Sequence, residues 1–95
     1  MDDTTLPPAD QLATLEWETI QVVPTSPWGA TNARVAENAR RLAGRAGVTL
    51  DQLATAAARS RRVMARRMSG AGRWTLDDVY NVAVALGVEP HTLVA

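Results

Sequence analysis

The stretch TLDQLATAAARSRRVMARRMSG, residues 49–70, decides the fold of this chain. Thr49 is a residue type that caps helix N-termini, and apolar residues follow it at helical spacing. Ser60 suits the cap of a second helix, and Gly70 suits the left-handed position at which many helices end. The stretch therefore predicts two short helices joined by a tight turn over residues 58–60. The apolar stripe of the first helix comprises Leu50, Leu53, Ala54 and Ala57.

Arginine dominates the second of these helices. At about 100° per residue, its apolar face carries Val63, Met64 and Met68, while the opposite face carries Arg61, Arg62, Ala65, Arg66 and Ser69. Arg67 falls on the apolar side, where its stem can lie along the core and its guanidinium can reach water or phosphate. Such a face either keeps a helix soluble or meets an anionic partner. Because no acidic residue lies between Asp51 and Asp77, the pattern favours a partner.

Three more helices are predicted from caps and stops on either side of this stretch. Thr31 or Asn32 caps a helix with Val35, Ala39, Leu42 and Ala46 on its apolar stripe, and Gly47 ends it. Thr75 and Asp78 form a capping box for a helix that stops at Gly87, and Pro90 opens a short final helix. The sequence therefore predicts an all-α domain of five helices over residues 31–95.

Residues 1–30 form an acidic arm and linker in this prediction. LEWETIQVV, residues 15–23, is rich in residues that favour strands, so we predict one short strand that carries Leu15, Trp17, Ile20 and Val22. The strand either pairs with its copy in a dimer or folds back onto the helices. We favour the dimer, because paired strands cover edges that a lone strand leaves open. Trp28 likewise either folds back or marks a partner surface.

Composition narrows the classes of function. Residues 1–33 have a net charge of −5 and residues 34–95 a net charge of +5, which suggests a basic body that meets a polyanion. The chain has no cysteine and one histidine, His91, so we expect no metal site and no cofactor. No catalytic constellation is evident, and we expect no enzyme. Without a long apolar run or a signal peptide, we expect a cytoplasmic protein that does not contact membranes or a small-molecule ligand.

Five short motifs in order give the chain a family resemblance. They are GVTLDQLA (47–54), SRRVM (60–64), SG (69–70), TLDDV (75–79) and ALGVEP (85–90). In this order and spacing, residues 33–94 resemble the lambda-repressor and Cro-like helix-turn-helix domains. The resemblance implies a helix-turn-helix fold, sequence-specific binding of double-stranded DNA and transcriptional control, often in a phage lysis–lysogeny switch. It places the second helix of the motif, residues 61–69, in the major groove.

The resemblance also implies roles for single residues. Base contacts would come from Ser60, Arg61, Arg62, Ala65 and Arg66. Phosphate contacts would come from Thr49, Arg59, Arg73 and Arg45. Two positions depart from the family pattern. Leu50 stands where a glutamine is common, so main-chain N–H groups must replace its hydrogen bond, and Ala58 stands where the turn often has glycine.

These observations predict a DNA-binding transcriptional regulator, a repressor or Cro-like protein that acts as a homodimer. The alternative from another class is a protein-interaction module on the same fold, such as an antitoxin or antirepressor, that acts through the acidic arm.

Overall fold

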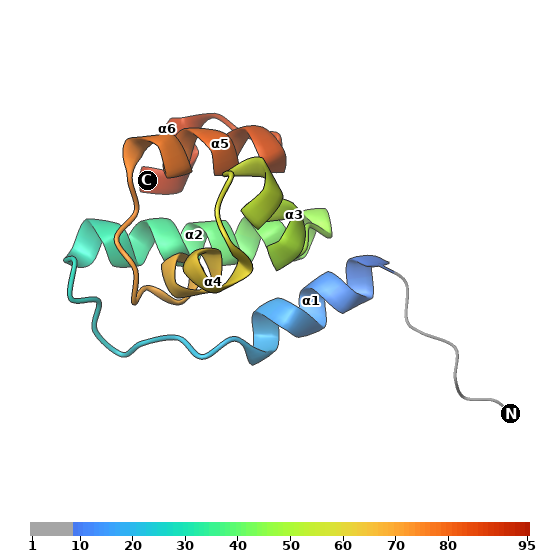
Figure 1. Ribbon diagram of the computed structural model, residues 1–95, viewed down its shortest axis with the longest axis horizontal. Helices are drawn as coiled ribbons and strands as arrows, with labels where there is room; N and C mark the ends of the chain where they lie inside the picture. Colours follow the sequence, from blue (N-terminus) through green and yellow to red (C-terminus); the bar gives the residue numbers. More distant parts are fainter. Residues whose placement is uncertain (1–8) are drawn as a thin grey trace, which may run out of the picture.

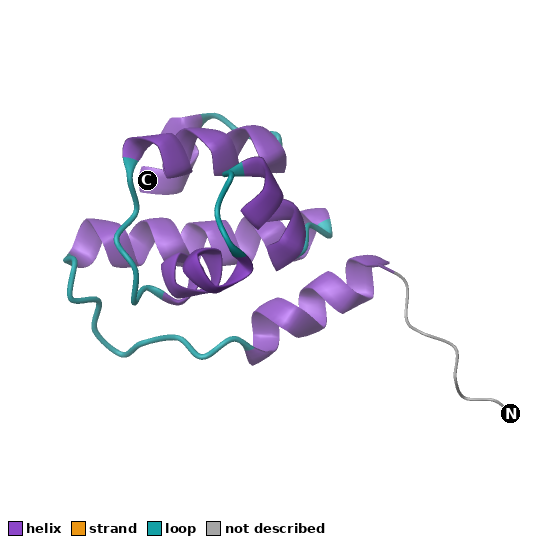
Figure 2. Cartoon of the chain, viewed as in Figure 1, coloured by secondary structure: helices purple, strands orange, loops and turns teal. Residues whose placement is uncertain are grey.

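The structure is a computed structural model that describes residues 9–95, with side chains from Leu12 onward. This part of the chain is entirely helical and contains no strand, so the all-α prediction is confirmed (Figures 1 and 2). The helices are α1 (Ala9–Thr19), α2 (Ala30–Ala46), α3 (Leu50–Ala56), α4 (Arg61–Ser69), α5 (Leu76–Leu86) and α6 (Pro90–Val94). Helices α2 to α6 are the five helices that the sequence predicts.

The predicted caps explain where α3, α4 and α5 begin. The Thr49 and Thr75 hydroxyl groups accept hydrogen bonds from the main-chain N–H groups three residues later, and each threonine belongs to a complete capping box. The Ser60 hydroxyl accepts the N–H of Val63 in the same way. Because these bonds join residues three positions apart, neighbouring residues are enough to set the starting points of the helices.

The start of α2 corrects a prediction. Gly29, and neither Thr31 nor Asn32, occupies the N-cap of this helix. Asn32 is buried, and its side chain bonds to other parts of the chain: its Nδ2 donates to the Gly72 carbonyl oxygen at 3.0 Å, and its Oδ1 accepts the N–H of Trp74 at 2.8 Å. The side chain therefore holds the loop between α4 and α5 and does not cap its own helix.

Helix α2 crosses the middle of the molecule, with α5 and α6 on one side and α4 on the other, and α3 lies near the C-terminal end of α2 and contacts both α4 and α5 (Figure 1). The core lies where these helices meet, and Leu53, Met64, Met68, Val82 and Leu93 have no solvent exposure. Two methionines on the inner face of α4 fix which side of that helix faces outward. The apolar stripe predicted for α4 is therefore its buried side.

The strand predicted over residues 15–23 is wrong. Residues 15–19 belong to α1, and irregular chain follows. Ala13, Trp17 and Ile20 recur at helical spacing and pack on the core, whereas Leu15 and Val22 are about half exposed. Burial of that stripe outweighs the weak strand preference of the segment. The arm thus folds back onto the helices at Trp17, which was the second of the two predicted arrangements.

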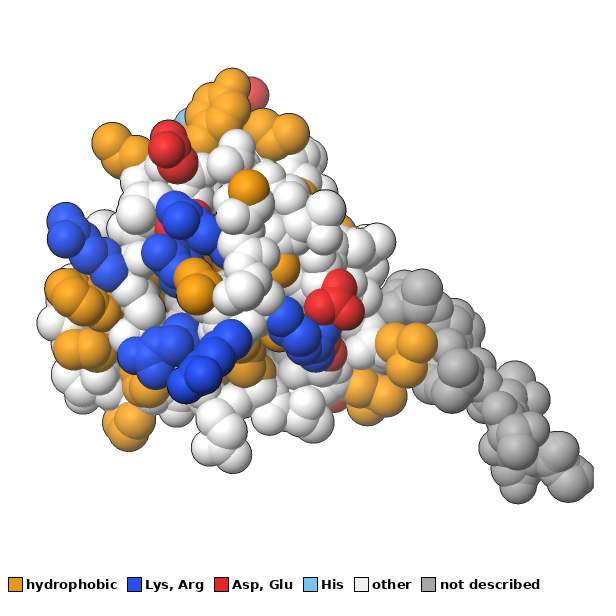
Figure 3. Space-filling model, in the orientation of Figure 1, with side chains coloured by type: hydrophobic (Ala, Val, Ile, Leu, Met, Phe, Trp, Pro, Cys, Tyr) orange, Lys and Arg blue, Asp and Glu red, His pale blue; other side chains and the backbone are white. Residues whose placement is uncertain are grey.

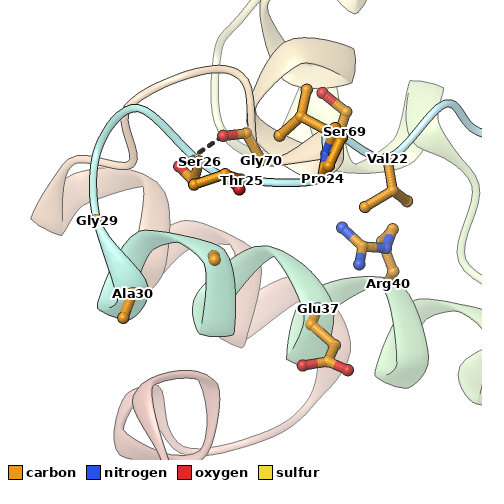
Figure 4. Close-up of a pocket in the computed structure, with 12 residues that line it drawn as sticks. Val22, Pro24, Thr25, Ser26, Gly29, Ala30, Glu37, Arg40, Ser69 and Gly70 are labelled. Carbon is orange, nitrogen blue, oxygen red and sulfur yellow. Dashed lines mark hydrogen bonds between the residues drawn. The ribbon is translucent and has the colours of Figure 1, made fainter.

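The linker between α1 and α2 lies across the end of α4. The Ser26 hydroxyl donates to the Gly70 carbonyl oxygen at 2.7 Å (Figure 4). The N–H of Val23 donates to the Ser69 carbonyl oxygen at 3.0 Å. On the side of α2, Arg40 donates to the Met68 carbonyl oxygen at 2.6 Å. Burial lowers the pKa of Arg40, although the neighbouring charge of Glu37 acts in the opposite direction. These bonds satisfy the last carbonyl groups of α4.

Candidate nucleic-acid interface

The outer side of α4 carries Arg61, Arg62, Ala65 and Arg66, which we call the arginine face. The three arginines are exposed and Ala65 is half-buried, while Met64 and Met68 anchor the opposite side of the helix. Basic side chains gather on this side of the molecule in Figure 3. A small side chain flanked by arginines lets a helix approach a groove closely and present guanidinium groups to it. Ser60 is exposed at the start of the helix, but its hydroxyl is used as the cap.

The arginines of this face differ in their partners. Arg62 and Arg66 form no ion pair or side-chain hydrogen bond with the described residues. Arg61 donates to Asp51 at 2.5 Å and to Glu16 at 3.0 Å. The hydrogen bonds from Arg61 to Asp51 and then to Glu16 raise the pKa of its guanidinium. Two arginines are thus free to meet an anion, and one is already paired.

Asp78 forms a buried ionic centre behind α4. Its side chain is 1% exposed, and it accepts hydrogen bonds from Arg59 Nε at 2.9 Å and from Arg67 Nε at 2.6 Å. Burial alone would raise the pKa of Asp78, but hydrogen bonds from Arg59 and from Thr75 outweigh that effect and lower it. Asp78 therefore stays ionised and ties α5 to the turn and to α4. The Arg67 guanidinium binds this carboxylate, and does not point to water or phosphate as the sequence suggested.

The residues implied as phosphate contacts are spread over several elements. Arg59 lies in the turn before α4 and is bound to Asp78, with 35% of its side chain exposed. Arg73 is exposed in the loop after α4, and its guanidinium carbon lies 5.8 Å from the centre of the Trp28 ring. Arg45 is exposed in the last turn of α2, and the Thr49 hydroxyl caps α3. The structure brings Arg59 and Arg73 to the two ends of α4, and it places Arg45 on a different helix.

Tryptophans hold the segments that flank α4. Trp74 is buried, and its Nε1 donates to the Arg67 carbonyl oxygen at 2.8 Å. Trp28 is 52% exposed, and its Nε1 donates to the Ala71 carbonyl oxygen at 3.1 Å. Trp74 therefore packs under the loop after α4, and Trp28 folds back against the same loop.

Two details of the motif differ from simple expectation. Ser69 shares the arginine side of an ideal helix, but it is 8% exposed, because the linker covers the end of α4. Ala58 adopts a positive φ of 54°, so the turn keeps the left-handed conformation that glycine usually provides.

The sequence did not reveal the carboxylate that meets Leu50. The N–H of Leu50 donates to Glu16 Oε1 at 2.7 Å, so a carboxylate of the chain itself occupies the main-chain N–H that was expected to replace the glutamine's hydrogen bond. Glu16 lies 34 residues earlier in the chain, and no local pattern connects the two residues.

No group of three His, Cys, Asp or Glu side chains from residues 12–95 is close enough to hold a metal ion. No helix within residues 9–95 is both long and apolar enough to cross a bilayer.

No family model and no curated protein matches this chain. Among solved structures, the fold is similar to the crystal structure of the hypothetical transcription factor NHTF from Neisseria. The TM-score is 0.64, and the match covers 81% of this chain and 90% of that one. The two sequences are 20% identical, so the similarity concerns the arrangement of the helices.

Proposed function

We propose that this protein is a sequence-specific regulator of transcription that binds double-stranded DNA with α4 in the major groove. The observation that carries the proposal is the arginine face: three exposed arginines beside a small residue, on a helix that Met64 and Met68 anchor from behind. The order of a short helix, a tight turn and a second helix in α3 and α4 is that of helix-turn-helix proteins, whose second helix lies in the major groove. The similarity to a hypothetical transcription factor supports the same role. Binding, and not catalysis, is the activity that we expect.

The test is selection of bound duplexes from a random pool, followed by measurement of affinity by fluorescence anisotropy. The wild-type protein should enrich a defined sequence. The triple variant Arg61→Ala, Arg62→Ala, Arg66→Ala should lose that preference while its circular dichroism stays helical. Equal affinity of the two proteins for the selected duplex would contradict the proposal and favour a protein-interaction module.

We further propose a repressor that acts as a homodimer in the cytoplasm. A single small DNA-binding module buries little surface, and a second half-site is the common way to reach tight binding. Because α1 packs on its own chain, strand pairing of the arm does not provide the dimer contact. Sedimentation with the selected duplex should show two protomers per DNA, and a reporter gene behind the selected site should be silenced. One protomer per duplex, or activation of the reporter, would contradict this proposal.

A further inference from the structure

We propose that helix α1 controls the arginine face through Glu16, whose carboxylate pairs with Arg61 and must leave it before that arginine contacts DNA. The inference rests on the proposed DNA-binding function and adds a regulatory contact within the chain. It starts from the two oxygens of Glu16. One accepts a hydrogen bond from Arg61 Nη2 at 3.0 Å, and the other accepts the N–H of Leu50 at 2.7 Å.

The backbone beside Glu16 is well anchored. Trp17 is 8% exposed, and its Nε1 donates to the Val48 carbonyl oxygen at 2.8 Å, while Ala13 on the same side of α1 is fully buried. Since Trp17 follows Glu16 directly, the core determines where the carboxylate lies. The fold therefore sets the position of the Glu16 carboxylate beside Arg61.

Asp51 adds a second carboxylate to the same guanidinium. It accepts a hydrogen bond from Arg61 Nη1 at 2.5 Å, so negative groups from α1 and α3 hold both terminal nitrogens of Arg61. A phosphate that approaches Arg61 meets the repulsion of these two carboxylates, and two of the five N–H donors of the guanidinium are already used. Arg62 and Arg66 have no such partner among the described residues. The face thus offers two free arginines and keeps the third paired.

The ion pair between Glu16 and Arg61 is weak enough to reduce DNA binding without abolishing it. The Arg61 side chain is 56% exposed and that of Glu16 is 25% exposed, so solvent weakens the pair. Pairs of this kind shift an equilibrium by roughly two- to fivefold. The contact therefore reduces binding to DNA at any sequence.

The experiment compares two charge-matched variants of the full chain, Glu16→Gln and Glu18→Gln. Glu18 lies on the same helix and is exposed, and it forms no ion pair with the described residues. Both variants remove one negative charge, so general repulsion of DNA changes equally. We expect Glu16→Gln to bind the selected duplex about two- to fivefold more tightly than Glu18→Gln at about 100 mM salt. The glutamine oxygen can still accept the N–H of Leu50, which preserves the fold.

A second comparison identifies the partner. In an Arg61→Ala background, most of the advantage of Glu16→Gln over Glu18→Gln should disappear, because the released arginine is absent. Equal affinities in the wild-type background, an undiminished advantage without Arg61, or weaker binding by Glu16→Gln would each overturn the inference. In those cases the wild-type protein still binds DNA and the proposed function stands. If no protein of the set binds any duplex, the proposed function fails and the inference fails with it.

Discussion

Ala58 joins α3 to α4 with a backbone that alanine seldom adopts, since its φ is 54°. A side chain at this conformation is strained by roughly 1–2 kcal/mol relative to glycine, and glycine loses about 0.5–1 kcal/mol through its freer unfolded chain. We therefore expect Ala58→Gly to raise the free energy of unfolding by up to about 1 kcal/mol, measured by urea denaturation. The control is Ala56→Gly in the last turn of α3, which should lower it by about 0.5–1 kcal/mol. Destabilisation by both glycines would show that the turn carries no strain.

Asp78 gives a second prediction at the scale of one residue. Asp78→Asn removes the charge that Arg59 and Arg67 share, and we expect it to lower the free energy of unfolding at neutral pH by roughly 1.5–3 kcal/mol. The control Asp77→Asn changes an exposed acid in the same turn and should cost at most about 0.5 kcal/mol.

The ionisation of Asp78 makes the difference in unfolding free energy between wild type and Asp78→Asn depend on pH. The pKa of Asp78 is lower in the folded protein than its ordinary value of 3.8 in the unfolded chain. Its contribution is therefore complete above about pH 4 and is lost as the pH falls through the folded-state pKa. Urea denaturation at a series of pH values should show wild type and Asp78→Asn converging in acid. A gap that stays constant would mean that the charge of Asp78 does not stabilise the fold.

At the scale of the element, the arginines of α4 differ in their expected roles. We expect Arg62 and Arg66 to bind DNA, and Arg67 to stabilise the fold. Arg62 and Arg66 are exposed, whereas Arg67 is 15% exposed and bound to Asp78. We expect Arg62→Ala or Arg66→Ala to weaken binding of the selected duplex by about 1–3 kcal/mol with little change in unfolding. Arg67→Ala should instead lower the free energy of unfolding.

Anisotropy titrations and urea denaturation of the same samples give both quantities. Arg34→Ala, the same change at an exposed position of α2, serves as the control and should leave both nearly unchanged. If Arg34→Ala weakens binding as much as Arg62→Ala does, the effect is one of general charge and α4 has no special part.

At the scale of the whole molecule, a chain with no net charge is expected to bind a polyanion, because its charges are segregated. Three phosphate contacts from Arg45, Arg59 and Arg73 predict that the logarithm of the binding constant falls with the logarithm of salt at a slope of about −2.7 per protomer. That slope weakens binding about 40-fold between about 50 and 200 mM salt. Arg45→Ala or Arg73→Ala should each reduce the slope by about 0.9 without changing the preferred sequence.

Anisotropy titrations over this range of salt measure the slope. A binding constant that does not change with salt would contradict phosphate contact. The Arg59 variant needs a parallel measurement of unfolding, because that arginine also stabilises Asp78.

The sequence alone determined where helices α3 to α5 lie. Thr49, Ser60 and Thr75 cap their helices through bonds to residues three positions away, and Met64 and Met68 follow the helical period. Such signals need only neighbouring residues, which is why the bounds of α3 to α5 and the outward side of α4 were predictable.

Only the tertiary structure decided what α1 and the ionic contacts do. The local composition around Trp17 favoured a strand. The segment is helical instead, because its apolar stripe is buried against α2 and the Trp17 Nε1 donates to the Val48 carbonyl oxygen. The pairing of Arg61 with Glu16 joins residues 45 positions apart, and that of Arg59 with Asp78 joins residues 19 apart. Partners at such distances are selected by how the helices pack, because the free energy of burying a stripe or pairing a charge depends on what the folded chain places opposite it.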